Sequence, residues 1–271
     1  MINKIAKDSL NKRNIKLTIM YDGSGYAGWQ RLGNLNKKSS IQTVLEESLS
    51  LYLGEEIKAI GSGRTDAGAH ALGQVANFSC HSKQSVEDMS KGLNEVLPED
   101  IAILNMKEVN KDFHSRYSAK AKTYEYRIDE GETQSVFTRK YTHHVPSPLN
   151  LEAMIEASAY LIGTHDFKAF STDRKDGKST SRTIESINIK RDANKRQLLK
   201  KTGINSNELR ITLTGDGFLY NMVRIIVGTL IEVGEGTRRP EDIKNILESR
   251  NRQMAGITVS SQGLFLCHVR Y

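Results

Sequence analysis

Residues 14–21, Asn-Ile-Lys-Leu-Thr-Ile-Met-Tyr, alternate apolar and polar side chains and begin the pattern that decides the fold. The apolar side chains of this stretch fall on one face of an extended chain, which predicts a half-buried strand. Residues 41–53 instead repeat their apolar side chains every three or four positions, which predicts an amphipathic helix. Working outward, the first half continues with two strands, a helix and a strand, at 58–62, 73–80, 86–96 and 101–109.

The same order of elements recurs in the second half of the chain. The patterns predict, in order, a strand, a helix, two strands, a helix, an extra helix and a closing strand, at 122–129, 151–162, 184–191, 208–214, 218–233, from Pro240 onward, and at 264–271. Each β-α-β-β-α-β unit is a ferredoxin-like arrangement. We therefore predict an α+β fold with two ferredoxin-like halves, 1–112 and 113–271. Their antiparallel sheets would join edge to edge into one antiparallel sheet flanked by helices.

Composition excludes several classes of protein. Hydrophobic residues make up 38% of the 271 residues, and no run approaches the roughly 20 apolar residues of a spanning helix. The first residues do not resemble a targeting signal. Two cysteines, Cys80 and Cys267, provide neither a disulfide framework nor a metal set. We expect a cytoplasmic protein without membrane contact.

The excess of positive charge lies in one segment. The formal net charge of the chain is +7, and residues 168–201 contain eleven basic and four acidic residues, a net charge of +7 in this segment alone. Such a segment favours a polyanionic partner. An ordinary solvated hairpin rich in lysine explains the same charge equally well, so charge alone leaves both interpretations open.

Residues 61–70, Gly-Ser-Gly-Arg-Thr-Asp-Ala-Gly-Ala-His, connect two predicted strands. Glycines there allow a ligand to approach the backbone closely, and Arg64 beside Asp66 would keep the carboxylate ionised for work as a nucleophile or base. The simpler alternative is a turn in which Asp66 bonds its own backbone. A dinucleotide fingerprint is excluded, because the sixth position holds Asp66 and a strand follows instead of a helix.

Three further clusters admit a packing role and a functional role. Residues 21–31 hold the only tryptophan, Trp29, which suits a core anchor or a platform for an unstacked base. In residues 113–126, Arg116 and Lys122 could hold a phosphate while Tyr124 stacks a base, although tyrosines in strands usually pack.

The last cluster, residues 217–230, places Arg224 inside an otherwise apolar helix. A buried arginine without a carboxylate is costly, so we expect an acidic partner such as Asp66, unless the side chain reaches solvent. Metal sites have little support, because neither His143-His144 nor His165-Asp166 has a third ligand at a diagnostic spacing.

Together these clusters resemble the TruA family of tRNA pseudouridine synthases. The similarity covers nearly the whole chain in order. It rests on YDGSGYAGWQR (21–31), GRTDAGAHA (63–71), FHSRYSAKAKTYEY (113–126), GTHDFKAF (163–170), GFLYNMVRIIVGTL (217–230) and GLFL (263–266). The resemblance implies an isomerase, without metal or cofactor, that converts uridine to pseudouridine at positions 38 to 40 of the tRNA anticodon arm. It also implies a homodimer.

The resemblance assigns roles residue by residue. Asp66 matches the catalytic aspartate, Arg64 the arginine that helps displace the target base, and Arg224 the basic partner of the aspartate. Tyr124 matches the tyrosine that stacks on the flipped uracil and could relay a proton. We also expect substrate binding by Gly263, Leu264 and the basic pair noted above.

Residues 255–263 depart from the family pattern, because they lack its prolines and should be less constrained. Two alternatives stay open: the same chemistry on another RNA, or a non-catalytic module that binds or folds RNA.

Overall fold

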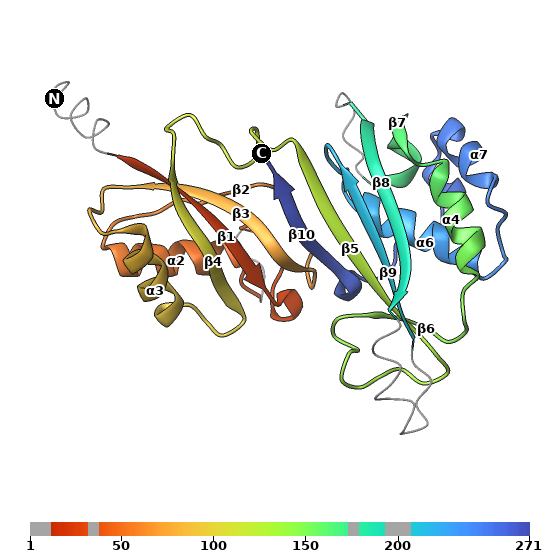
Figure 1. The fold of residues 1–271 in the computed structure, drawn as a ribbon, viewed down its shortest axis with the longest axis horizontal. Helices are drawn as coiled ribbons and strands as arrows, with labels where there is room; N and C mark the ends of the chain where they lie inside the picture. Colours follow the sequence, from red (N-terminus) through yellow and green to blue (C-terminus); the bar gives the residue numbers. More distant parts are fainter. Residues whose placement is uncertain (1–11, 32–37, 173–178, 193–206) are drawn as a thin grey trace. The chain divides into compact units, whose positions relative to one another are not determined.

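The computed structural model of this chain describes residues 12–31, 38–172, 179–192 and 207–271 (Figure 1). These residues form an α+β fold with two compact units. Unit 1 takes its described residues from before Ala121 and from Leu266–Tyr271, and unit 2 comprises the described part of Ala121–Phe265. The closing strand β10 (Leu264–Arg270) therefore begins in unit 2 and ends in unit 1.

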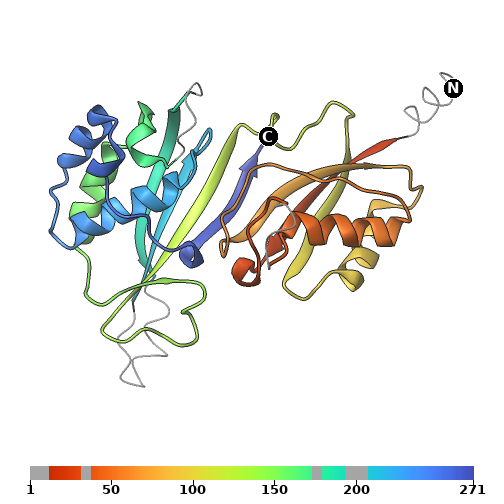
Figure 2. The same cartoon turned by 180° about the vertical axis from the view of Figure 1, so that it is seen from behind.

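Unit 1 contains an antiparallel sheet with the order β4-β1-β3, in which β2 pairs with β3 and β10 is also adjacent to β3. Its strands are β1 (Arg13–Tyr21), β2 (Ile60–Gly61), β3 (His70–Cys80) and β4 (Ile101–Val109). Helices α2 (Ile41–Leu53) and α3 (Val86–Val96) cover one face of this sheet (Figures 1 and 2).

The core of unit 1 follows the alternation in the sequence. Ile15, Leu17 and Ile19 of β1 are fully buried, and Leu17 lies opposite Ala76 on β3 and Met106 on β4. Local signals set the helix ends, since a serine caps each N-terminus through its side chain. The β-α-β-β-α-β prediction for this half is confirmed.

Unit 2 has the strand order β5-β9-β8-β7, with β6 beside β5. Its strands are β5 (Ala121–Glu130), β6 (His143–Val145), β7 (Gly163–Asp166), β8 (Ser181–Asp192) and β9 (Asn207–Gly215). Its helices are α4 (Leu151–Ala159), α6 (Met222–Gly234) and α7 (Asp242–Ser249). Short 3-10 turns are η2 (Phe167–Phe170), η3 (Arg252–Met254) and η4 (Ser261–Gly263).

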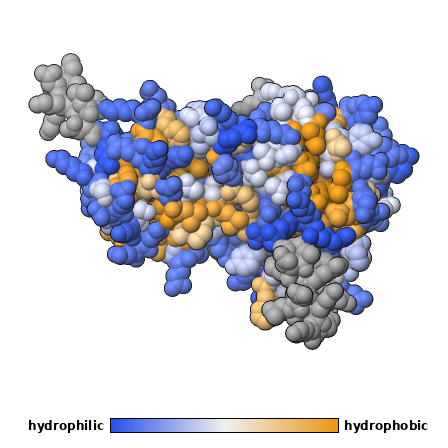
Figure 3. Space-filling view, in the orientation of Figure 1, coloured by the Kyte–Doolittle hydropathy of each residue, from blue (hydrophilic) through white to orange (hydrophobic). Residues whose placement is uncertain are grey.

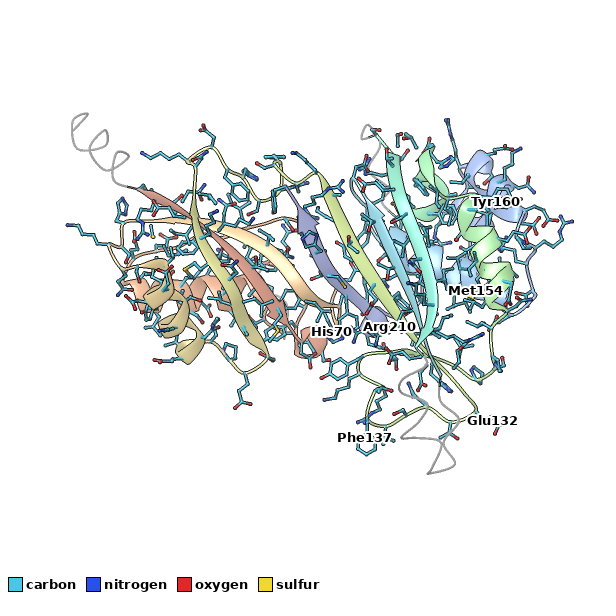
Figure 4. The ribbon with its side chains drawn as sticks, viewed as in Figure 1. His70, Glu132, Phe137, Met154, Tyr160 and Arg210 are labelled. Carbon is cyan, nitrogen blue, oxygen red and sulfur yellow. The ribbon has the colours of Figure 1, made fainter. Side chains whose placement is uncertain are left out.

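Helix α6 lies within the core of unit 2. All of its residues are buried except Arg224 and Glu232, which are intermediate in exposure. Helix α4 packs against α6 and β8. The loop between β5 and β6 is far more exposed, and its Phe137 is 87% exposed and points outward (Figure 4).

Several predicted details of unit 2 need correction. Strand β6 pairs with β5 in parallel, Ile128 opposite His143, so the strands are not all antiparallel. The short strands β6 and β7 were not expected at all. Helix α6 begins at Met222 instead of 218, because Asn221 adopts a left-handed conformation with φ 62°.

Apolar side chains also reach the surface. On the face drawn in Figure 3, areas of hydrophobic residues lie among hydrophilic ones. On the strands, Met20 of β1 and Leu104 of β4 are 42% and 51% exposed. Since apolar atoms make up much of any folded protein's surface, these single residues carry no functional meaning.

Candidate active site

Backbone and side-chain hydrogen bonds hold the loop between β2 and β3. The amide of Ala69 donates to the carbonyl of Asp66 at 3.0 Å, and Gly68 adopts φ 78°. At the start of the loop, the Ser62 hydroxyl donates to the Gln74 side chain at 2.7 Å, while the Gln74 amide donates to the Gly63 carbonyl at 3.0 Å. The loop is therefore a closed, hydrogen-bonded turn.

The charged residues of this turn are more exposed than the threonine between them. Thr65 is buried, whereas Arg64 is exposed and Asp66 is intermediate. The Tyr21 hydroxyl, on β1, lies 2.8 Å from the hydroxyl of Thr65. The buried neighbour thus anchors the loop next to Asp66, which keeps part of its surface exposed.

The 21–31 segment wraps around the same loop. The amide of Trp29 donates to the carbonyl of Thr65 at 3.1 Å, and the amide of Gly68 donates to the Tyr26 carbonyl at 3.3 Å. Farther along, the amide of Gly23 donates to Nδ1 of His70 at 3.1 Å, at the start of β3 (Figure 4).

Trp29 is 3% exposed, and a Cβ atom at Gly61 would lie 2.4 Å from its indole ring. Between the two roles that the sequence left open for Trp29, these contacts favour the core anchor.

Arg116 also belongs to unit 1. It is exposed, and its guanidinium lies 5.8 Å from the centre of the Tyr117 ring, which is 77% exposed. The neighbouring Ser115 is buried, and its carbonyl accepts a hydrogen bond from Tyr271 at 2.8 Å. This anchor fixes the backbone and leaves a cation and an aromatic ring at the surface.

In unit 2, Lys122 and Tyr124 share one face of β5, since they are two residues apart. Tyr124 is 7% exposed, and Phe218 packs against it edge to face at 5.2 Å between ring centres. Packing of this kind fixes the plane of the Tyr124 ring.

Arg224 projects from the first turn of α6. Its Nε donates to the Val259 carbonyl at 2.7 Å, and its Nη1 donates to Oδ1 of Asn221 at 3.0 Å. The amide nitrogen of Asn221 in turn donates to the Thr172 hydroxyl at 2.8 Å. These bonds orient the guanidinium within unit 2, while the acidic partner expected for Arg224 stays a prediction.

Comparison with known proteins identifies a family for this chain. The family model described as tRNA pseudouridine synthase matches residues 17–118 and 157–271. The chain belongs to the tRNA pseudouridine synthase family. Its resemblance to that family, read from the motifs alone, is confirmed, and so is the prediction of an isomerase.

Named relatives extend along almost the entire chain. It is 43% identical to tRNA pseudouridine synthase A of Acetivibrio thermocellus, over 96% of this chain and all of that protein. A protein of Clostridium tetani named tRNA pseudouridine synthase A 2 is 45% identical over 96% of this chain and 99% of its own length. For tRNA pseudouridine synthase A of Bacillus sp. strain KSM-64 the identity is 46%, over 93% and 97%.

The expected site residues of this pseudouridine synthase are found in both units. Arg64, Asp66 and Arg116 lie in unit 1, and Lys122, Tyr124, Arg224, Gly263 and Leu264 lie in unit 2. Gly263 is buried, and a Cβ atom there would lie 2.8 Å from the Arg127 carbonyl. Leu264 is 5% exposed. Close packing thus explains both residues, and their contact with substrate stays a prediction.

Sequence reasoning assigned no role to Tyr21, Thr65 or Asn221. Tyr21 holds Thr65, the residue next to Asp66, and Asn221 accepts a hydrogen bond from Arg224. Asn221 alone left a weak signal, because asparagine adopts the left-handed conformation found here more readily than most residues. The contacts of the other two are non-local and have no local pattern.

Histidines considered as metal ligands have other partners. Nδ1 of His143 lies 3.1 Å from the Ser260 hydroxyl, and Nε2 of His144 lies 2.6 Å from the Gly131 carbonyl. Among the residues that the structure describes, no three acidic, histidine or cysteine side chains cluster as metal ligands would. No helix in the described ranges has the length and apolarity needed to cross a membrane.

The basic segment 168–201 lies partly outside the described residues, including Lys195, Arg196, Lys200 and Lys201. Of its described members, Arg191 donates to both carboxylate oxygens of Glu130, at 2.8 and 3.0 Å. Glu130 is 1% exposed, so Arg191 neutralises a buried carboxylate of unit 2.

Proposed function

We propose that this pseudouridine synthase modifies uridines 38 to 40 in the anticodon arm of tRNA, with Asp66 as the catalytic group. Membership in the family makes the chain an isomerase acting on tRNA. The observation that supports Asp66 is its place in the hydrogen-bonded turn, where Thr65 is buried and Asp66 is partly exposed.

The reaction breaks the bond between N1 of uracil and C1′ of the ribose, turns the base, and joins C5 to C1′. C5 loses its proton and N1 gains one, so the product is an isomer of the substrate. Both reacting carbons are inaccessible while the base is stacked, so the uridine must flip out, at a cost of a few kcal/mol. Asp66 would attack the sugar or the base, or remove a sugar proton.

The other site residues divide the remaining work. Arg64, exposed beside Asp66, would occupy the space of the displaced base and compensate for lost stacking. Tyr124 would stack on the flipped uracil, and Arg224 would pair with the aspartate. Arg116 and Lys122 would contact phosphates, which position an RNA without reading its sequence. A fixed loop serves this chemistry because catalytic groups that are already oriented lower the entropic cost of reaction.

The test compares Asp66→Asn with Asp112→Asn, a matched loss of one carboxylate on an exposed turn. Each protein is incubated with an unmodified tRNA transcript and no added cofactor, and pseudouridine is then mapped chemically. We expect product at positions 38 to 40 from the wild type and the control, and none from Asp66→Asn, with unchanged tRNA affinity.

Full activity of Asp66→Asn would contradict the assigned mechanism. Product at other positions, or in another RNA, would contradict the anticodon assignment but keep the chemistry. Binding without conversion by the wild type would indicate the non-catalytic RNA module.

We also propose a cytoplasmic homodimer, as the resemblance implies. Sedimentation should show a species of twice the monomer mass, and a purely monomeric boundary at micromolar concentration would contradict the dimer. Fractionated cells should contain the protein with the cytoplasmic tRNA.

A further inference from the structure

A short segment of unit 2, Ala255–Ser260, lies directly along helix α6 and is called the strap below. Two glycines allow its backbone to approach the helix. A Cβ atom at Gly228 would lie 2.1 Å from the carbonyl oxygen of Ile257, and one at Gly256 would lie 2.8 Å from the amide nitrogen of Thr229. Any larger residue at either glycine would push the strap away from α6.

Side chains of α6 then hold the strap by hydrogen bonds. The fully buried Thr229 donates its hydroxyl proton to the Ile225 carbonyl at 2.8 Å, which leaves its oxygen to accept the Gly256 amide at 3.0 Å. One turn along, Glu232 accepts the Ile257 amide at 3.3 Å. The missing prolines of this segment are thus replaced by specific anchors to the helix.

The far end of the strap carries two carbonyls that accept side-chain hydrogen bonds, one from the site residue Arg224 and one from Tyr126 of β5. Val259, 2% exposed, accepts the Nε proton of Arg224 at 2.7 Å. The next carbonyl, of Ser260, accepts the hydroxyl proton of Tyr126 at 2.7 Å. Burial raises the pKa of Tyr126 above its ordinary value, which keeps that hydroxyl protonated as a donor. The position of the strap therefore determines where the Arg224 guanidinium points.

We propose that Thr229 is a positioning residue for Arg224, which it holds in its catalytic orientation through the strap. Thr229 fixes Gly256, and the chain between Gly256 and Val259 transmits that position to the carbonyl that receives the Arg224 Nε proton. The inference rests on the proposed catalytic role of Arg224. It extends that role, since Thr229 belongs to the buried face of α6 and would otherwise be read as core.

The experiment compares Thr229→Val, which removes the hydroxyl but keeps the shape, with Thr229→Ser, which keeps the hydroxyl. Turnover of unmodified tRNA is measured together with the solvent exchange of the Arg224 Nε proton by NMR. We expect Thr229→Val to lower kcat roughly 10- to 100-fold, the effect of a small misplacement of a catalytic group. KM should change less than about twofold, and the Nε proton should exchange faster. Thr229→Ser should match the wild type in all three.

A second comparison separates positioning from general stability. Arg224→Lys removes the planar group whose Nε the strap holds. In that background Thr229→Val should have little further effect on kcat, since both changes disrupt one interaction. If Thr229→Val does not fold, Glu232→Ala removes the other anchor from a half-buried position and should reduce kcat in the same way, though less.

Unchanged kcat, unchanged Nε exchange, or an equal loss in the Arg224→Lys background would each overturn the proposal. A wild type that makes no pseudouridine would contradict the proposed function instead. The exchange of the Arg224 Nε proton would still decide whether Thr229 fixes the guanidinium.

Discussion

The backbone amide of Trp29 donates to the carbonyl oxygen of Thr65, the residue that precedes Asp66, at 3.1 Å. The side chain of Thr65 is also held, by the hydroxyl of Tyr21. Thr65 is therefore fixed through both its main chain and its side chain by one segment, residues 21–31. That segment supports the turn that carries Asp66, and Gly28 is where a side chain would disturb this support most.

Gly28→Ala should disrupt the turn that carries Asp66. Gly28 has φ 94°, and a Cβ atom there would lie 2.5 Å from the Thr65 carbonyl oxygen and 2.9 Å from the carbonyl carbon of Asp66. The left-handed backbone alone costs about 1–2 kcal/mol for a residue with a side chain. We expect kcat to fall about 100-fold, because the turn must move. Single-turnover assays with unmodified tRNA measure this effect.

Gly25→Ala is the matched control, since it lies in the same segment and a Cβ atom there has nothing within 4 Å. It should keep wild-type kcat and a wild-type thermal midpoint. Equal activity of the Gly28 and Gly25 variants would show that the 21–31 segment does not support the turn.

Trp29 should behave as a core residue in solution. It is the only tryptophan of the chain and is 3% exposed, so its fluorescence reports on one site. We expect a blue-shifted emission, weak quenching by acrylamide, and no change when saturating tRNA is added. Trp29→Ala should lower the free energy of unfolding by about 3–5 kcal/mol. Strong quenching of the emission by tRNA would instead indicate base stacking on Trp29.

Much of the fold could be predicted because its long elements have clear periodicity. The alternation of β1 places Ile15, Leu17 and Ile19 in the core, as expected. Strand β6 has only three residues, too few for any period, and its parallel pairing with β5 depends on the path of the loop between them. The start of α6 was missed because one residue, Asn221, breaks a pattern that looks helical.

The site was less accessible to sequence reasoning. The charges at 64 and 66 and the lone arginine at 224 could be singled out from residue type alone. Roles for these residues could be proposed only from the resemblance to a family. The hydrogen bonds that hold their neighbours in place are visible only in the structure. Close contacts such as that between Gly228 and the Ile257 carbonyl join residues far apart in sequence, so no local pattern encodes them. The hydrogen bonds that hold the strap to α6 could not be predicted either, because they join residues far apart in the sequence.

Two substitutions at Tyr124 should distinguish a role in base stacking from a role in proton transfer. Tyr124→Leu removes the ring that packs against Phe218 and would stack on uracil. Stacking on an aromatic side chain contributes about 1–3 kcal/mol per base, so kcat/KM should fall about 10- to 100-fold. Tyr124→Phe keeps the ring, and we expect an unchanged KM with a kcat about 100-fold lower, as for loss of a proton-transfer group. Presteady-state kinetics measure both constants, and wild-type kcat in the Phe variant would restrict Tyr124 to stacking.

Two parts of the basic segment should differ in function. Arg191 donates twice to the buried carboxylate of Glu130, and this hydrogen bonding raises the pKa of Arg191. Arg191→Gln leaves that carboxylate without its cation, so the free energy of unfolding should fall by about 2–3 kcal/mol. Its effect on tRNA binding should be small, because the guanidinium already has an internal partner. Urea unfolding and filter binding of the same preparation measure the two quantities.

Reversal of charge at Lys195, Arg196, Lys200 and Lys201 should have the opposite profile. If these residues contact phosphates, tRNA binding weakens and the slope of log K against log salt becomes less steep by about 3, because each phosphate contact contributes slightly less than one unit. Stability in urea should not change by more than about 0.5 kcal/mol, the usual range for surface substitutions. An unchanged slope would make these four residues ordinary solvated surface. A flattened slope in Arg191→Gln would show that Arg191 leaves Glu130 when RNA binds.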